Sequence, residues 1–299
     1  MDFEKKHQED LQRLRGFRLL DDDFMTKVFE DISCAELLLR IILNDEGIRV
    51  LEAHSQRGIK NLQGRSVKLD ILAVDSHNRV FNVEVQRSDR GAGAKRARYN
   101  SALIDANVTE PGDQYEDLNE TFVIFITEND VMKAGLPIYH IDRVVRETGK
   151  LFEDEEHIIY VNSQIKDETK LGRLMHDFSC TDAKDMYNKV LADRVRYFKE
   201  DERGVEIMCR EMEIMRNQAH EEGIEKGRIM QLIKQVCVKM QKFSSAEEVA
   251  NDLVEQDVPL IQKIMNVAPD FAPDYNVNDI YNALKLSSCQ NAPYAETIH

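Results

Sequence analysis

The sequence predicts an α/β protein in which a mixed central sheet is flanked by helices and followed by a helical C-terminal region. Three observations support this: apolar residues at helical spacing over 24–43, alternating apolar and polar residues over 68–86, and a continuous apolar run over 121–127. The last run, "TFVIFIT", is rich in β-branched and aromatic residues, which is typical of a strand buried on both faces. The order helix, strand, hairpin, helix, buried strand defines the α/β class.

The remaining elements follow in chain order. Asp21 to Asp23 offer N-caps to the first helical run, which Asn44 and Gly47 end. Residues 47–55 predict a strand before the hairpin, and residues 91–108 predict a helix entered through a glycine-rich turn. The segments "PIYHIDRVV" and "HIIYVNS" predict further strands at the edge of the sheet.

From about Thr181 onward the strand signals disappear, so we expect one domain over residues 1–180 and a helical region over 181–299. A capping box at Ser244 or Ser245 and Pro259 in a first turn predict two helix starts there. A heptad-like apolar stripe predicts a packing seam, which is covered either by the chain's own first domain or by a second copy in a homodimer through these helices. Its members are Val205, Met208, Met212, Met215, Ala219, Met230, Ile233, Cys237 and Met240.

Composition excludes several classes of protein. The 299 residues carry a formal charge of −15, so any nucleic acid must meet a local basic patch. The five cysteines form no CxxC pair and are expected to be reduced cytosolic thiols. Asp2, Glu4 and Glu9 argue against a signal peptide, and the longest apolar stretch is broken by Arg40. We therefore expect a cytoplasmic protein without a membrane partner.

The hairpin carries an acidic residue in each strand. Pairing Asp75 with Arg79 around a three-residue loop fixes the register and puts Asp70 directly opposite Glu84. Gln86 then shares the face of Glu84. Because like charges placed opposite each other are destabilising, the chain either solvates both carboxylates on an open face or holds a cation between them.

Asp70 followed by Glu84-Val85-Gln86 has the form of a D…(D/E)xK metal site, with Gln in the Lys position. Mg²⁺ prefers oxygen ligands and keeps several waters. Two carboxylates and the carbonyl of Val85 would leave positions open for a phosphate oxygen and an attacking water. Gln86 can hydrogen-bond that water but brings no positive charge.

Several segments in a fixed order resemble the Rpn family of recombination-promoting nucleases and transposases, within the PD-(D/E)XK superfamily. They are Asp70, "FNVEVQ", "KRARYNSAL", "GDQYEDLNETFVIFIT" and "IIYVN". The resemblance covers roughly residues 23–161 and extends more loosely to "EEGIEKGR". It implies a restriction-endonuclease-like core and a metal-dependent DNA endonuclease that uses Mg²⁺, Mn²⁺ or Ca²⁺, with a role in DNA recombination. ExQ in place of ExK is common among such proteins.

The resemblance assigns roles to individual residues. Asp70, Glu84 and the Val85 carbonyl would bind the metal, and Gln86 would position water. Glu36 would be the acidic residue that many superfamily members place on the first helix; alternatively, Glu36 and Arg40 form a surface pair one turn apart.

A local basic patch follows the acidic strand and predicts DNA contacts. It holds five positive charges, Arg87, Arg90, Lys95, Arg96 and Arg98, against Asp89. Lys68 and Tyr99 are further candidates for contact with DNA, and the alternative for the patch is a solvated basic helix face. The alternative function is a catalytically inactive DNA-binding or protein-interaction module on the same fold.

Overall fold

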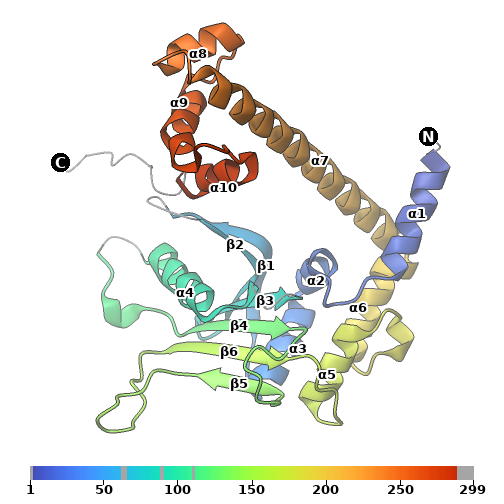
Figure 1. Cartoon of the computed structure of the whole chain (residues 1–299). Coiled ribbons are helices and arrows are strands. Elements are labelled where there is room, and N and C mark those ends of the chain that lie inside the picture. The colour runs from blue at the N-terminus through green and yellow to red at the C-terminus, as the bar shows by residue number, and fades with distance from the viewer. Residues whose placement is uncertain (1–2, 62–65, 88–90, 110–111, 288–299) are drawn as a thin grey trace. The chain divides into compact units, whose positions relative to one another are not determined.

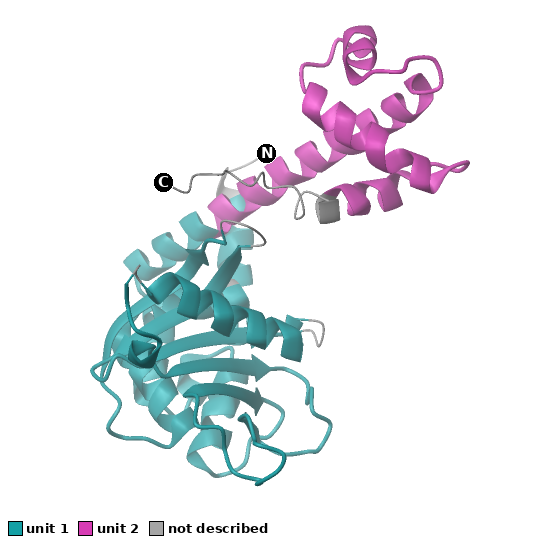
Figure 2. Cartoon of the chain, turned by 90° about the vertical axis from the view of Figure 1, so that its left-hand side faces the viewer, with its two compact units in different colours: residues 1–61, 66–211 teal, residues 62–65, 212–299 magenta. Residues whose placement is uncertain are grey.

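The computed structural model describes residues 3–61, 66–87, 91–109 and 112–287. It has a six-stranded mixed sheet flanked by helices and a helical C-terminal region, which confirms the predicted fold class (Figure 1). The chain forms two compact units, the first ending at Glu211 and the second beginning at Met212 (Figure 2).

The sheet has the strand order β1-β2-β3-β4-β6-β5. Strands β1 to β3 are antiparallel, β3, β4 and β6 are parallel, and β5 pairs antiparallel with β6 at the edge. The bounds are β1 Val50–Ile59, β2 Val67–Asp75, β3 Val80–Gln86, β4 Thr121–Thr127, β5 Ile138–Ile141 and β6 Glu156–Asn162. Both late strands were predicted at the edge; β6 instead lies inside the sheet, because the short β5 covers it.

The hairpin has the predicted register. Its ladder runs from Val74 opposite Val80 to Ile71 opposite Val83. The Asp75 amide donates to the Arg79 carbonyl (3.2 Å), and Asn78 in the loop has a left-handed φ of 60°. The turn chemistry therefore sets which residues of β2 and β3 share a face.

Helices cover both faces of the sheet. Helix α4 (Ala94–Val108) lies on one side, where Ala97 packs with Val123 and Phe125 of β4 (Figure 1). Helices α2 (Asp22–Phe29) and α3 (Ile32–Leu43) lie on the other side. All seven residues of β4 are consequently buried, as their continuous apolar run predicted.

The single helical run predicted over 24–43 is two helices in the structure. Asp31 ends the first and caps the second, because its carboxylate accepts the amides of Ser33 (3.0 Å) and Cys34 (3.2 Å). The first unit also contains α1 Phe3–Arg15, α5 Lys170–Ser179, α6 Lys189–Glu200 and the short helices η2 Tyr115–Asp117 and η3 Ala183–Asp185.

The second unit has its own apolar core, to which the end of α7 (Glu202–Lys239) contributes Ile233 and Val236. The capping box predicted at Ser244 or Ser245 is formed by Ser245 with Glu248 at the start of α8, and Pro259 lies in the first turn of α9 as predicted. The helices are α8 Ala246–Leu253, α9 Val258–Val267, η4 Ala268–Phe271 and α10 Val277–Ser287.

The first compact unit extends beyond the domain boundary predicted at residue 180, because α6 packs into it through Phe198 against Phe24. Compact units defined by contacts do not test where the predicted domain ends, so the boundary at residue 180 stays a prediction. The dimer through the C-terminal helices also stays a prediction. Among the described residues, no helix is long and apolar enough to cross a bilayer. Cys34, Cys180, Cys209 and Cys237 are free thiols, and Cys289 lies outside the described residues.

Helix α7 runs through Gly223 and Gly227, which lie between Ala219 and Met230 of the apolar stripe. A Cβ added at either glycine would meet nothing within 4 Å. Gly223→Ala and Gly227→Ala are therefore each expected to stabilise the helix by about 1 kcal/mol. Thermal unfolding of the two variants checks this expectation, and a lower melting temperature would contradict it.

Candidate active site

The Asp70 and Glu84 carboxylates meet just beyond the last pair of the β2–β3 ladder. Their side chains are 7% and 0% exposed. The Asp70 amide donates to Oε1 of Glu84 (3.4 Å), and the Val85 amide donates to Oδ2 of Asp70 (3.1 Å). Each carboxylate thus accepts a backbone amide of the other's strand, which places two acidic groups side by side in the protein interior.

Two buried amides orient Glu84, and sequence reasoning missed both. Nδ2 of Asn82 donates to Oε1 of Glu84 (3.0 Å) and to the Ile71 carbonyl (3.3 Å). Nδ2 of Asn100 in turn donates to Oδ1 of Asn82 (3.1 Å). The signal for Asn82 was present in the sequence, since it precedes Glu84 by two positions in a strand and so shares its face.

Burial raises the pKa values of both carboxyl groups. It raises the pKa of Asp70 to about 8, helped by the negative charges of Glu84 and Asp22. Burial also raises the pKa of Glu84, while the hydrogen bond from Asn82 and the charge of Arg96 lower it. Two carboxylates that resist ionisation without a cation are typical of a functional site.

Asp22, the exposed first residue of α2, lies close enough to act electrostatically on the pair, which sequence reasoning missed. Its charge raises the pKa of both Asp70 and Glu84. The sequence showed Asp22 only as one of three candidate N-caps. Its position depends on packing between elements, which local sequence does not specify.

A ring of ion pairs holds this end of α2 near the ends of β3 and β4. Asp21 pairs with Arg18 (3.4 Å) and Arg87 (3.0 Å), and Glu128 pairs with the same two arginines (3.0 and 3.3 Å). Because Asp21 immediately precedes Asp22, the ring fixes the third carboxylate relative to the hairpin. Arg87, predicted to contact DNA, is thus a member of this ring.

Glu36 lies elsewhere. Its carboxylate pairs with Arg40 and accepts the Val50 amide (3.0 Å). Val50 pairs with Asp75 at the turn end of the hairpin, five residues from Asp70, or about 16 Å along a strand. The structure therefore does not bring Glu36 to the acidic pair, and its catalytic role stays a prediction.

Arg96 and Gln86 both adjoin the carboxylates. Nη2 of Arg96 pairs with Oε2 of Glu84, and Nη1 donates to the Gly91 carbonyl (2.9 Å). Gln86 is half-buried, and a Cβ built on Gly91 would lie only 1.7 Å from its Oε1. Arg96, predicted as a DNA contact, is thus a direct partner of the acidic pair.

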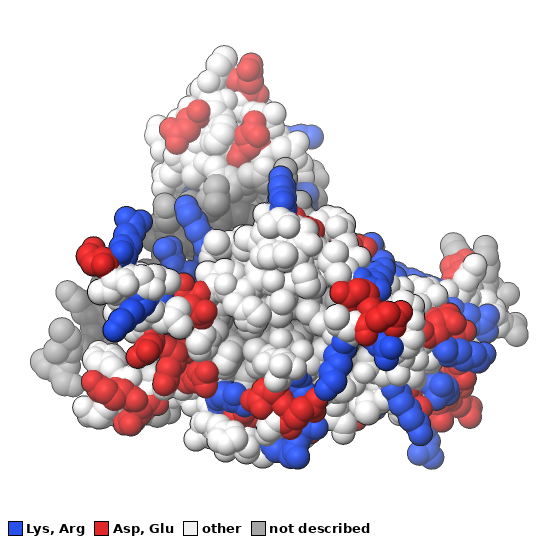
Figure 3. All heavy atoms as spheres, turned by 90° about the horizontal axis from the view of Figure 1, so that it is seen from below, with Lys and Arg blue, Asp and Glu red and all other residues white. Residues whose placement is uncertain are grey.

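The other predicted DNA contacts differ in exposure. Lys68, Lys95 and Arg98 are exposed, whereas Tyr99 is half-buried and its hydroxyl accepts Nδ2 of Asn61 (3.0 Å). Asp89 and Arg90 lie outside the described residues. On the face drawn in Figure 3, basic and acidic side chains are interspersed.

The donor set at the hairpin fits a hard divalent cation. Two carboxylates converge there, and the Val85 carbonyl points to the same side of β3 as its amide, which contacts Asp70. The Gln86 carbonyl points the other way and accepts the Glu128 amide (3.0 Å). Asp70, Glu84 and Val85 can therefore supply three oxygens, the ligand type that Mg²⁺ prefers.

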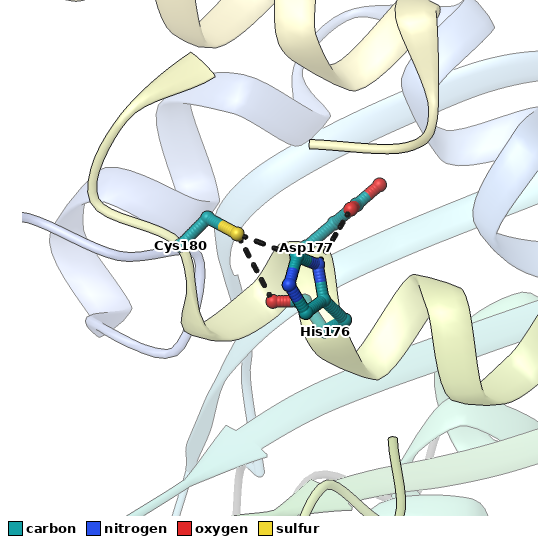
Figure 4. Close-up of side chains that lie close together, drawn as sticks. All are labelled: His176, Asp177 and Cys180. Atoms are coloured by element: carbon teal, nitrogen blue, oxygen red, sulfur yellow. Dashed lines mark hydrogen bonds and ion pairs between the residues drawn. The ribbon is translucent and has the colours of Figure 1, made fainter. Parts of the chain in front are cut away.

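A second cluster on α5 has a softer donor set (Figure 4). Nδ1 of His176 lies 3.5 Å from Oδ1 of Asp177 and 3.5 Å from Sγ of Cys180. Asp177 already accepts the amides of Tyr187 and Asn188 (both 2.8 Å) and so joins α5 to the segment before α6. Burial raises the pKa of the Cys180 thiol to about 11. These groups could hold a metal, but a thiol does not suit Mg²⁺.

The mixed sheet with helices on both faces is consistent with a nuclease-like domain, and a family model supports that class. Residues 36–177 match the family model described as PD-(D/E)XK nuclease family transposase. The matched residues contain the whole sheet, Asp70 and Glu84, and the match confirms the resemblance drawn from the sequence. No curated protein and no solved structure matches the chain.

Proposed function

We propose that the protein is a metal-dependent endonuclease that hydrolyses phosphodiester bonds of DNA at the Asp70–Glu84 pair. The observation that carries this proposal is the convergence of two buried carboxylates from neighbouring strands within the family-matched residues. Burial raises the pKa of both groups, because the interior disfavours two bare negative charges. A bound Mg²⁺, Mn²⁺ or Ca²⁺ would remove that penalty.

The chain's own groups have separate roles in this proposal. Asp70, Glu84 and the Val85 carbonyl would hold the cation, which would neutralise charge on the phosphate and lower the pKa of the attacking water. The Gln86 amide would orient that water toward phosphorus. The water would lose a proton to solvent as its oxygen forms the new P–O bond, and the leaving oxygen would take up a proton from solvent as its bond to phosphorus breaks. Lys68, Lys95 and Arg98 would hold the DNA backbone.

Cleavage of supercoiled plasmid by the purified protein tests this function. We expect nicked and linear products with Mg²⁺ or Mn²⁺ and none with EDTA. If the folded protein cuts with none of Mg²⁺, Mn²⁺ and Ca²⁺, the function is instead that of a catalytically inactive binding module. Gln86 is the residue that favours this alternative, since it lacks the charge of the usual lysine.

Asp22 and Glu36 compete for the role of third acidic residue. Asp22→Asn is expected to slow cleavage about 10- to 100-fold and to weaken Mn²⁺ binding, because it removes a charge next to both metal ligands. Glu36→Gln is expected to lower thermal stability more than cleavage, because it disturbs the Arg40 and Val50 contacts. If Glu36→Gln slows cleavage more than Asp22→Asn does, and Asp22→Asn lowers the melting temperature more, Glu36 is the third acidic residue.

A further inference from the structure

The acidic pair has a positive partner that the motif itself does not provide. Gln86 occupies the position of the motif lysine and carries no charge, whereas three carboxylates, Asp22, Asp70 and Glu84, act on one another here. Arg96 lowers the pKa of Asp70 and Glu84, and it pairs directly with Oε2 of the latter. The positively charged side chain next to the carboxylates is thus Arg96 of helix α4.

Arg96 is held in a defined orientation. Its guanidinium is fixed by Glu84, by the Gly91 carbonyl and by the Phe125 ring, whose centroid lies 5.9 Å from Cζ. The side chain nevertheless remains 39% exposed, in contrast to the fully buried Glu84. Of the five N–H donors of a guanidinium, the hydrogen bonds to Gly91 and Glu84 use two.

The guanidinium also lies next to the position of the missing lysine. Gly91 contacts both side chains: its carbonyl accepts Nη1 of Arg96, and its Cα faces Oε1 of Gln86 so closely that no Cβ would fit. A positive charge at either side chain would therefore act on the same small region beside the carboxylates.

We propose that Arg96 is a catalytic residue that binds the scissile phosphate and supplies the positive charge that Gln86 lacks. This inference rests on the proposed nuclease function. An arginine suits the role because its planar fork of donors can bind one carboxylate and one phosphate oxygen at once. Preorganised donors aimed at a reacting group act mainly on the turnover rate.

Lys95 and Arg98 offer the contrast within the same helix. Both are exposed on α4, and neither contributes to the pKa shifts of Asp70 or Glu84. They are expected to contribute to the affinity for DNA, so that their removal raises KM. Arg96 is expected to act on kcat instead.

The test compares kcat and KM of metal-dependent cleavage for a short set of variants. Arg96→Gln is expected to lower kcat about 100- to 1000-fold with little change in KM, whereas Lys95→Gln raises KM. Adding Gln86→Lys to Arg96→Gln is expected to restore kcat at least tenfold, because the lysine puts a charge beside Gly91. Arg196→Gln, in an exposed pair with Asp193 (2.7 Å), is a matched control expected to behave as wild type.

The outcomes separate this proposal from the proposed function. If wild type cuts DNA and Arg96→Gln keeps its kcat within about threefold, Arg96 is not catalytic although the nuclease function stands. The proposal is also overturned if Arg96→Gln folds and loses kcat, and the added Gln86→Lys substitution does not restore kcat. If wild type does not cut at all, the nuclease function fails and this proposal fails with it. Should Arg96→Gln fail to fold, Arg96→Lys takes its place. Activity of Arg96→Lys within about tenfold of wild type supports the role of the charge. A loss of activity as large as that caused by Asp70→Asn, which removes a metal ligand, contradicts that role.

Discussion

Asp70→Asn is expected to lower the rate of plasmid cleavage at least about 1000-fold while the fold is kept. The carboxylate lies against Glu84 and accepts the Val85 amide, and an asparagine of the same shape can still accept that amide. What the substitution removes is one of two charged metal ligands, so the cation loses its site and the attacking water loses its activation. The initial rate of nicking measures the effect.

Asp105→Asn is the matched control for this loss. Asp105 is a half-buried carboxyl on α4 whose pKa is also raised by burial. It lies outside the acidic pair, so its substitution is expected to leave the nicking rate near that of wild type. Equal losses in both variants would mean that general destabilisation, and not loss of a metal ligand, explains the effect at Asp70.

The contribution of Asp70 to the stability of the metal-free protein is expected to fall as pH rises from about 4 to about 8. The pKa of Asp70 is near 3.8 when unfolded and is raised to about 8 in the folded protein. Between these values the folded state holds more protons than the unfolded state, so each rise in pH favours unfolding. Asp70→Asn removes this titration. Its advantage in melting temperature over wild type is therefore expected to grow by several degrees between pH 5 and pH 8.

A bound metal ion is expected to offset the loss of stability that the ionised Asp70 causes at high pH. At pH 8, Mn²⁺ is expected to raise the melting temperature of wild type, since a ligand that binds only the folded state stabilises it, and to leave Asp70→Asn unchanged. Thermal unfolding at both pH values, with and without Mn²⁺, measures both effects. An advantage of Asp70→Asn that is equal at pH 5 and pH 8 would contradict the raised pKa.

The centre of the site could be predicted from the sequence because it depends on local rules. Alternation within the strands and the chemistry of the turn at Asp75 to Arg79 determine the register, and the register brings Asp70 to Glu84. The continuous apolar run identified β4 in the same way, since a strand buried on both faces has no alternation.

The parts that could not be predicted depend on how distant elements pack. Asp22 acts on the pair from the start of α2, and the preceding residues Asp21 and Arg18 form ion pairs with Arg87 and Glu128, which are more than 60 positions away in the chain. The pairing of Arg96 with Glu84 depends on the rotation of α4 over the sheet, so the sequence showed Arg96 only as one basic residue in a patch. The division of the first helical run at Asp31 depends on a cap that the apolar spacing does not reveal.

The most direct test of the central claim is to locate the cation. Crystals of the protein grown or soaked with Mn²⁺ are expected to show an anomalous peak within about 2.0–2.6 Å of oxygens of both Asp70 and Glu84. That result would establish the hairpin as a metal site independently of any activity. A peak among His176, Asp177 and Cys180 with none at the hairpin would contradict the account.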